Sequence, residues 1–411
     1  MTQPKLSICI PTYNRAPYLE KALACLAQAQ WPFAHEIVIS DNASTDSTAE
    51  VVERFIAQGL PIRYLRCPVN AGPGPNLTNA IRHAQGDYMI YQGDDDLLIL
   101  PRIAEVVAFL DANPDVSAAH APWYLHDEVN RVDTRKFYEV AEDTKFAQGD
   151  FLSVFEFLFQ GHVFPEIAIY RMDAVRSAFV PSHFCFWPFV YLAHFLDAGA
   201  VAFLKEPFYR SVTASTVAPE RAQAGMDDVM SSWDLYRGGL EYFLHFGAAR
   251  GQLSMGEEAR AIYAKMCQIF TALRMSVAVR LWVARHDYVR AYELYTRMVI
   301  AGQGEHPSLG DLKDRLPVMV GLQRLAYAVS AVPEITHLVL SDTQDVAHIA
   351  ELLTSMGLRD NVEVVADGGS ADPSTTAVLA SSAERADEFI ERGHPRGFVF
   401  LEQELLGNVV V

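Results

Sequence analysis

The sequence predicts an α/β protein with a mainly parallel, Rossmann-like sheet, and three observations support this fold class. Short apolar runs such as 6–10 (LSICI) and 36–40 (EIVIS) alternate with stretches of helical spacing over the first hundred residues. The connections are long enough for crossover helices, which place helices on both faces of a parallel sheet. Each apolar run also ends in a polar cluster, as strands do where they meet a ligand-binding edge.

The elements follow one another in a regular order. Strands are expected at 6–10, 36–40, 61–66 and from 88, with helices at 17–28, 44–58 and 76–84 between them. A helix at 101–113, a strand at 116–120, a charge-rich surface excursion at 126–148 and an aromatic helix at 151–160 come next.

Four polar clusters stand at the carboxyl ends of the expected strands: 12–15, 41–42, 70–72 and 94–96. Because parallel strands end at the same edge, these clusters should converge on one rim of the sheet. Three adjacent carboxylates at 94–96 repel one another, and a hard divalent cation such as Mg²⁺ or Mn²⁺ would offset that cost. The alternative is a solvated acidic turn in which Asp96 caps the next helix.

The motifs IPTYNR, ISDNASTDST, NAGPGPN and AQGDYMIYQGDDDLL, in this order, resemble the nucleotide-sugar half of a family 2 glycosyltransferase with a GT-A fold. They are most similar to the branch with the abequosyltransferase-like enzymes of bacterial surface polysaccharide synthesis. The resemblance is strong over 5–101 and weak to about 210. It implies metal-dependent transfer of a sugar from a nucleotide diphosphate donor, with inversion at the anomeric carbon.

The donor residues follow from this resemblance and from chemistry. Tyr13 can offer a flat face to the base, and Asp41 can accept from a pyrimidine N–H. Arg66 and Asn70 could meet ribose or phosphate. The alternatives are a turn-forming role for Asp41 and loop hydrogen bonding for Arg66 and Asn70. The predicted nucleotide-sugar-binding set is Pro11, Thr12, Tyr13, Arg15, Asp41, Arg66, Asn70, Gly72, Asn76 and Asp94.

The predicted cofactor is Mn²⁺ or Mg²⁺. The resemblance assigns Asp95 to the metal and Asp94 to the metal or the ribose, while Asp96 caps or orients the loop. The cation would neutralise the diphosphate and stabilise it as a leaving group.

The catalytic base is where the sequence departs from the family. Many members place a Glu-Asp pair at the start of the last helix of the domain, but Trp187 and Pro188 stand there and neither accepts a proton. Inverting transfer needs a base near the acceptor hydroxyl. The predicted catalytic candidates are His183, placed first because it lies just before this helix, and Glu166.

We expect three regions: a GT-A domain at 1–215, with a donor half at 1–100 and an acceptor half at 101–215, a helical region at 216–332 and a small α/β domain at 333–411. Long helices are expected at 226–246, 256–285, 287–300 and 317–332. They form either a bundle packed on the catalytic domain or an interfacial surface for a lipid-linked acceptor. The last domain has no dinucleotide fingerprint, and a role in oligomerisation is a hypothesis.

Composition limits the partners. The chain has 411 residues and a net charge of -18, which disfavours nucleic acid and anionic lipid as bulk partners. Its five cysteines lack CxxC spacing, so reduced thiols and a cytoplasmic location, at most at the inner face of the membrane, are expected. The sequence contains no apolar stretch of ~18 uncharged residues, so no membrane span is expected.

The predicted function is therefore transfer of a sugar to a glycan or lipid-linked acceptor. One alternative is a sugar nucleotidyltransferase. A triphosphate would need a loop rich in glycine and basic residues, however, and PTYNRAPY offers only Arg15. Another is a nucleotide-sugar-binding or scaffold protein without catalysis, suggested by Trp187 and Pro188.

Overall fold

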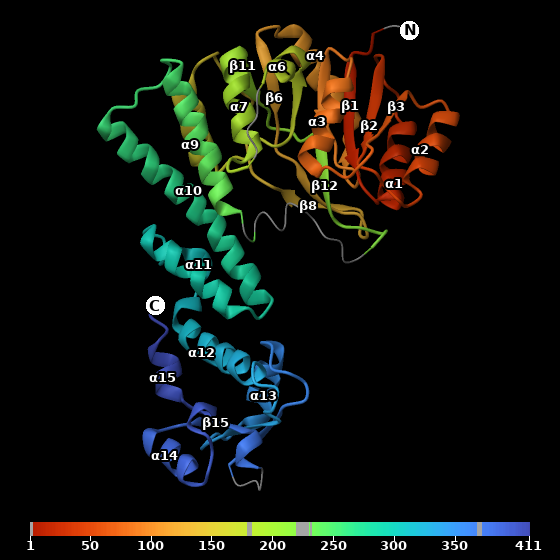
Figure 1. Ribbon diagram of the computed structural model, residues 1–411. Coiled ribbons are helices and arrows are strands. Elements are labelled where there is room, and N and C mark those ends of the chain that lie inside the picture. Colours follow the sequence, from red (N-terminus) through yellow and green to blue (C-terminus); the bar gives the residue numbers. More distant parts are fainter. Residues whose placement is uncertain (1–2, 179–182, 219–229, 231, 368–371) are drawn as a thin grey trace. The chain divides into compact units, whose positions relative to one another are not determined.

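The computed structural model (Figure 1) describes residues 3–178, 183–218, 230, 232–367 and 372–411. Two compact units make up the chain. Unit 1 is Met1–Gln223 with Asp234–Phe270, and unit 2 is Ala224–Trp233 with Thr271–Val411. The boundary falls within helix α10 (Glu257–Ala284), so the expected helical region at 216–332 is shared between the units instead of standing alone.

Unit 1 is organised around a mixed sheet of eight strands in the order β3-β2-β1-β4-β10-β6-β11-β9. Strands β1 to β4 are parallel, which confirms the predicted alternation, whereas β10 runs antiparallel to β4 and β6, and β9 antiparallel to β11. The strands are β1 (Leu6–Thr12), β2 (His35–Asp41), β3 (Ile62–Arg66), β4 (Tyr88–Tyr91), β6 (Val116–His120), β9 (Thr144–Phe146), β10 (Ala168–Arg171) and β11 (Ala200–Phe203).

The helices of unit 1 cover this sheet. α1 and α2 pack against each other, and α3 packs across β1 and β2. Because the chain moves outward from β1 to β3 and then returns to β4, right-handed crossovers put α3 on the opposite face from α1 and α2. The helices are α1 (Ala16–Ala27), α2 (Thr48–Ala57), α3 (Pro73–His83), α4 (Leu100–Ala112), α5 (Phe151–Gly161), α6 (Met172–Ser177), α7 (Trp187–Ala198) and α9 (Trp233–Ala249).

The segment 126–148, expected to be a surface excursion, contains strands. A second sheet has the order β5-β12-β7-β8, with β5 (Leu97–Leu98), β7 (Tyr124–Asp127), β8 (Val132–Lys136) and β12 (Tyr209–Ala214). The prediction missed β8 because its residues VDTRK are polar or charged at most positions and half or fully exposed, so no apolar alternation marks the strand.

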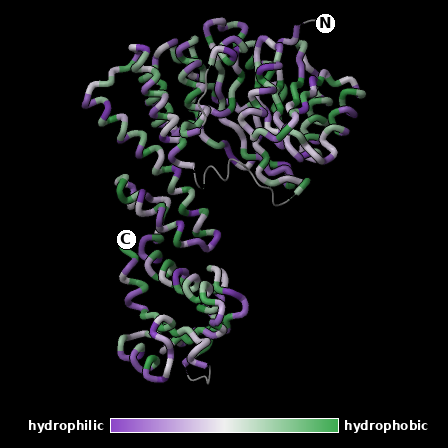
Figure 2. Tube along the Cα trace, in the orientation of Figure 1, coloured by the Kyte–Doolittle hydropathy of each residue, from purple (hydrophilic) through white to green (hydrophobic). Residues whose placement is uncertain are grey.

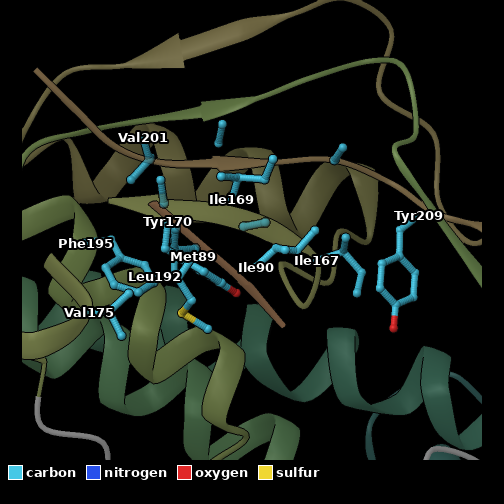
Figure 3. Packing of buried hydrophobic residues seen from close by; sticks show 14 of the residues in the cluster. Met89, Ile90, Ile167, Ile169, Tyr170, Val175, Leu192, Phe195, Val201 and Tyr209 are labelled. Atoms are coloured by element: carbon cyan, nitrogen blue, oxygen red, sulfur yellow. The ribbon is translucent and has the colours of Figure 1, made fainter. Parts of the chain in front are cut away.

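The core of unit 1 is continuous and rich in aromatic side chains. Met89 of β4, Tyr170 of β10 and Phe195 of α7 are all buried and lie close together (Figure 3). This packing fixes α7 against the middle of the sheet, so its first turn is held near the carboxyl end of β4.

Unit 2 combines helices with a small sheet, as predicted. The sheet is fully parallel in the order β14-β13-β15-β16. Helix α12 begins five residues earlier than expected and carries Pro317 inside it. The elements are α11 (Tyr288–Ile300), α12 (Leu312–Ser330), β13 (His337–Leu340), α13 (Val346–Ser355), β14 (Glu363–Ala366), β15 (Thr376–Ala380), α14 (Ala383–Glu391), β16 (Val399–Leu401) and α15 (Glu402–Gly407).

One helix in the described part of the chain, α10, is long and apolar enough to cross a membrane, with a mean hydropathy of 1.2 over its most apolar window. Half of that window (50%) is buried, and polar residues interrupt the apolar ones along it (Figure 2). Core helices of soluble proteins meet the same criteria, so this finding alone does not assign α10 to a membrane.

Candidate functional site

The rim of the large sheet begins with the turn after β1. Asn14 adopts a left-handed conformation (φ 52°), which asparagine tolerates better than most residues. Its backbone N–H donates to Ser44 Oγ (2.9 Å), and its side chain accepts from the Thr45 N–H (2.7 Å). This double link joins the loop after β1 to the loop after β2. It leaves Tyr13 with 42% of its surface exposed at the edge.

Asp41, at the end of β2, is fully buried (0% exposed). One carboxylate oxygen accepts from the Ser44 N–H (2.8 Å) and the other from the Tyr64 hydroxyl (2.5 Å). Burial, together with the Asp41 carboxylate, raises the pKa of Tyr64 well above its usual value. Arg66 lies 3.9 Å from Asp41 and donates to the Ser44 carbonyl. Both carboxylate oxygens of Asp41 thus have partners within the protein. Its contact with a nucleotide base stays a prediction.

The loop after β3 is tied to the same rim by amide side chains. Asn42 donates to Asn70 Oδ1 (2.8 Å) and accepts from the Ala71 N–H (3.0 Å). Gly72 has φ 91°, a conformation that favours glycine, and is the residue before α3. Asn76 is buried and donates to the Thr12 carbonyl (3.2 Å). These residues fix the loop, and their predicted donor contacts remain predictions.

The acidic cluster after β4 meets the loop after β1. Thr12 Oγ1 donates to Asp94 Oδ2 (2.7 Å). Arg15 donates through Nε to Asp94 Oδ1 (2.9 Å) and through Nη2 to Asp95. The pKa of Asp94 is raised to about 6, because burial and the Asp95 charge raise it by more than Arg15 and Thr12 lower it. At neutral pH Asp94 is therefore mostly ionised.

Asp96 has a different task from its two neighbours. Its carboxylate accepts from the Tyr209 hydroxyl (2.8 Å) and from the Val212 N–H (2.9 Å), both on β12. It thereby anchors the acidic loop to the second sheet, and it orients the loop rather than facing the rim.

Part of this chain matches a known protein family. Residues 7–178 match the family described as Glycosyl transferase family 2. This domain belongs to that family. Abequosyltransferase RfbV of Salmonella typhimurium is 41% identical over 113 residues, which make up 27% of this chain and 34% of that protein. GalNAc(5)-diNAcBac-PP-undecaprenol beta-1,3-glucosyltransferase of Campylobacter jejuni is 28% identical over 150 residues, 36% of this chain and 48% of that protein. The matched stretches thus span a third to a half of these relatives.

Similar solved structures include Staphylococcus aureus TarS 1-349 in complex with UDP-GlcNAc, at 16% identity and a TM-score of 0.48, covering 78% of this chain and 86% of that one. Mannosyltransferase PcManGT from Pyrobaculum calidifontis, in complex with GDP-Man and Mn2+, has 16% identity and a TM-score of 0.43, with the same coverage. TM-scores below 0.5 are too low to carry an argument, so the assignment of the family 2 domain rests on the sequence match.

The family 2 domain offers oxygen ligands suited to a divalent cation. Among the described residues, no group of three or more His, Cys, Asp or Glu side chains is arranged to hold a metal. Mg²⁺ and Mn²⁺, however, commonly take only one or two carboxylates and complete their shell with phosphate and water. Asp94 and Asp95 fit that smaller donor set in chemistry, but Arg15 is bonded to both. A bound cation would supply charge neutralisation of the diphosphate.

Tyr91 connects this cluster to the start of α7, which the sequence predicted to lie in the acceptor half. The Tyr91 ring meets that of Trp187, the first residue of α7, edge-on with centroids 6.5 Å apart. Burial raises the pKa of Tyr91 far above its usual value, and the charges of the acidic loop and of Glu166 raise it further. Because β10 runs antiparallel to β4, Glu166, half-buried in the turn before β10, lies toward the carboxyl end of β4 on the same rim. His183, by contrast, is an exposed side chain outside any helix or strand.

A cavity of about 540 Å³ lies beside the start of α7. It is lined by Phe184 and Cys185 of the preceding segment and by α9, including Arg237, Glu241 and Tyr242. Phe184 is 82% exposed. Phe184 stands three positions before Trp187, so ~10 Å of chain at most joins it to the start of α7.

Gly238 sets the close approach of α9 to this segment. A Cβ atom at Gly238 would lie 2.1 Å from the Phe184 carbonyl oxygen. We expect Gly238→Ala to lower the free energy of unfolding by ~1–3 kcal/mol through overpacking. Thermal unfolding followed by circular dichroism would measure this. Gly256→Ala is the matched control because nothing lies within 4 Å of a Cβ there; equal melting of both variants would contradict the prediction.

The sequence had no signal for three residues that organise this site. Tyr64, Tyr91 and Tyr209 bond or border the key carboxylates, yet each stands in a strand where a tyrosine is ordinary. Asp46, which caps α1 by accepting from the Ala16 N–H (3.0 Å), lies inside a motif but had no assigned role.

Proposed function

We propose that this chain is an inverting glycosyltransferase that moves a sugar from a nucleotide diphosphate donor to a glycan or lipid-linked acceptor in bacterial surface polysaccharide synthesis. The observation that carries the proposal is the junction of Thr12, Arg15, Asp94 and Asp95 at the carboxyl ends of the parallel strands β1 and β4. Within a family 2 domain, these carboxylates could hold a cation that neutralises a nucleotide diphosphate bound at this edge of the sheet.

The donor rests with its base against Tyr13 and its diphosphate toward the acidic cluster. Mn²⁺ or Mg²⁺ is the proposed cofactor. Asp95 would hold it, and Asp94 would contact either the cation or the ribose. Arg66 and Asn70 border the ribose and phosphate side. The relatives named above support this donor class, since one is an abequosyltransferase and another a glucosyltransferase.

Glu166 is the proposed base, ahead of His183, which reverses the order predicted from sequence. Glu166 is half-buried, and its backbone carbonyl accepts from the Tyr170 hydroxyl (3.3 Å). Burial raises the pKa of Tyr91, Tyr138 and Tyr170, and the charge of Glu166 raises each of them further. The Glu166 carboxylate takes the proton of the acceptor hydroxyl while that oxygen forms the new bond to the anomeric carbon and the diphosphate leaves. The exposed His183 lacks a comparable setting.

The acceptor occupies the side of the domain beyond Trp187. The cavity between Phe184 and α9 offers an exposed aromatic face beside the ion pair of Arg237 and Glu241 (2.7 Å). Aromatic faces with adjacent polar groups suit the mixed apolar and hydroxylated surface of a sugar. We place the protein in the cytoplasm, at the inner face of the membrane where a lipid-linked acceptor would be met.

Tyr13→Ala should weaken binding of a nucleoside diphosphate about tenfold, because stacking of a base on an aromatic ring contributes ~1–3 kcal/mol. Tyr13→Phe, which keeps the flat face, is the matched control and should bind as the wild type does. Calorimetric titration with UDP, GDP, CDP and dTDP measures the effect. Unchanged affinity of Tyr13→Ala for the nucleotide that the wild type binds best would refute the stacking role.

A panel of UDP, GDP, CDP and dTDP sugars, offered with glycan and lipid-linked acceptors, tests the function itself. Transfer to an acceptor with release of the nucleoside diphosphate supports the proposal. Formation of pyrophosphate would indicate a nucleotidyltransferase, and donor binding without turnover would favour a binding protein, the candidate suggested by Trp187 and Pro188.

A further inference from the structure

Arg15 forms ion pairs with two carboxylates of the rim. Its guanidinium donates to Asp94 (2.9 Å) and to Asp95, and only 26% of the side chain is exposed. One cationic group thus bridges two adjacent carboxylates. The Thr12 hydroxyl donates a hydrogen bond to the other carboxylate oxygen of Asp94. The pair that a divalent cation would bind is already partnered within the protein.

The position of Arg15 is built into the fold. The left-handed turn at Asn14, held by Ser44 and Thr45, sets the direction of the chain just before it. The guanidinium lies over the Tyr18 ring at 4.4 Å from its centroid, one helical turn along α1. A planar guanidinium on an aromatic face is preorganised for bidentate bonding, which a lysine would not reproduce.

Two consequences follow from this arrangement. A guanidinium and a divalent cation cannot occupy the same carboxylate oxygens, so binding of one opposes binding of the other. Once released, however, the guanidinium would find phosphate oxygens within its reach, since its fork matches phosphate as well as carboxylate. The nucleotide diphosphate offers both the metal's missing ligands and a new partner for Arg15.

We propose that Arg15 is an internal counter-ion that is exchanged when the donor binds. In the free protein it offsets one of the two negative charges of Asp94 and Asp95 and keeps the affinity for free divalent cations low. When a nucleoside diphosphate enters with its cation, the carboxylates turn to the cation and Arg15 turns to the diphosphate. The cation is therefore recruited with the donor rather than before it. The proposal rests on the proposed function only in taking a diphosphate as the ligand.

The test uses Mn²⁺ alone as the probe, on the full chain, by calorimetry and by electron paramagnetic resonance of free Mn²⁺. Arg15→Ala should bind Mn²⁺ about ten- to a hundredfold more tightly than the wild type, because a cation within ~4–6 Å changes the affinity of a carboxylate for positive charge by that order. Arg15→Lys keeps the charge but loses the paired N–H donors of the guanidinium, so its affinity for Mn²⁺ should lie between those of the wild type and Arg15→Ala. Arg54→Ala, at an exposed pair with Glu20, is the matched control and should leave Mn²⁺ binding unchanged.

A second arm adds UDP or GDP, whichever the wild type binds. The wild type should bind Mn²⁺ at least tenfold more tightly with the nucleotide present, while Arg15→Ala should lose most of this gain and bind the nucleotide more weakly. Equal Mn²⁺ affinity of wild type and Arg15→Ala, with melting temperatures showing both folded, would overturn the exchange. Because the Mn²⁺ arm needs no turnover, its result is independent of whether the protein transfers a sugar.

Discussion

Asp95→Ala is expected to abolish the metal-dependent part of donor binding while the fold persists. Asp95 is the more accessible of the two paired carboxylates, with 17% of its side chain exposed against 9% for Asp94. Loss of a metal ligand should cost at least about a hundredfold in donor affinity in the presence of Mn²⁺, since even indirect partners of metal ligands contribute 10–100-fold. Titration of the donor with and without Mn²⁺ measures the difference.

Asp87→Ala is the matched control, because Asp87 lies just before the opposite end of β4 and half of its side chain is exposed (50%). It should bind donor with the same Mn²⁺ dependence as the wild type. If Asp95→Ala kept the wild-type affinity for donor when Mn²⁺ is present, the metal assignment would fail. Thermal melting of both variants shows whether a loss of binding reflects a loss of fold.

The first hundred residues could be predicted from sequence because local pattern and global fold agree there. Apolar runs end at polar clusters, and the parallel pairing of β1 with β2 and β4 brings those clusters to one edge. Any one cluster is ambiguous, but parallel topology allows only one common edge. The hydrogen bond from Thr12 to Asp94, between residues 82 positions apart, follows from that topology.

For β8 and for the helices after residue 230, the local sequence pattern did not indicate the tertiary arrangement. β8 lies at the edge of a small sheet and is polar on both faces, so its pairing with β7 depends on neighbours distant in sequence. The helices after 230 were predicted as helices, yet the unit to which each belongs depends on tertiary packing. Helix α10 contributes Phe270 to the core of unit 1 and Met275 to that of unit 2, and no local pattern marks the change.

In the site, residue types were more predictable than their partners. The sequence indicated that Arg15 and the acidic cluster belong to one rim, but not that the arginine would bridge Asp94 and Asp95. The ion pair depends on the left-handed turn at Asn14 and on the Tyr18 ring, two features of geometry. Likewise, the sequence did not indicate that the two carboxylate oxygens of Asp41 would accept from the Ser44 N–H and the Tyr64 hydroxyl.

The base is the place where family pattern and this chain differ, and it gives the second large effect. Trp187 and Pro188 open α7, with proline in its first turn, where it fits because the first N–H groups of a helix need no intrahelical partner. The Trp187 ring contacts that of Tyr91, so an aromatic pair stands where many family members have the Glu-Asp pair. Outside the acidic loop, Glu166 is a carboxylate whose charge also raises the pKa of Tyr91.

Glu166→Gln should therefore lower kcat by ~10²–10⁴ and leave donor affinity intact, which is the usual cost of removing a general base. Glutamine keeps the shape and hydrogen-bonding capacity of the side chain, so a structural role alone would leave kcat nearly unchanged. Measuring kcat with saturating donor and acceptor, beside calorimetric donor affinity, separates the two roles. His183→Ala, the matched control, should retain wild-type kcat because its side chain is exposed. The opposite pattern, with His183→Ala inactive and Glu166→Gln active, would return the base to His183, and full turnover by both variants would exclude either residue.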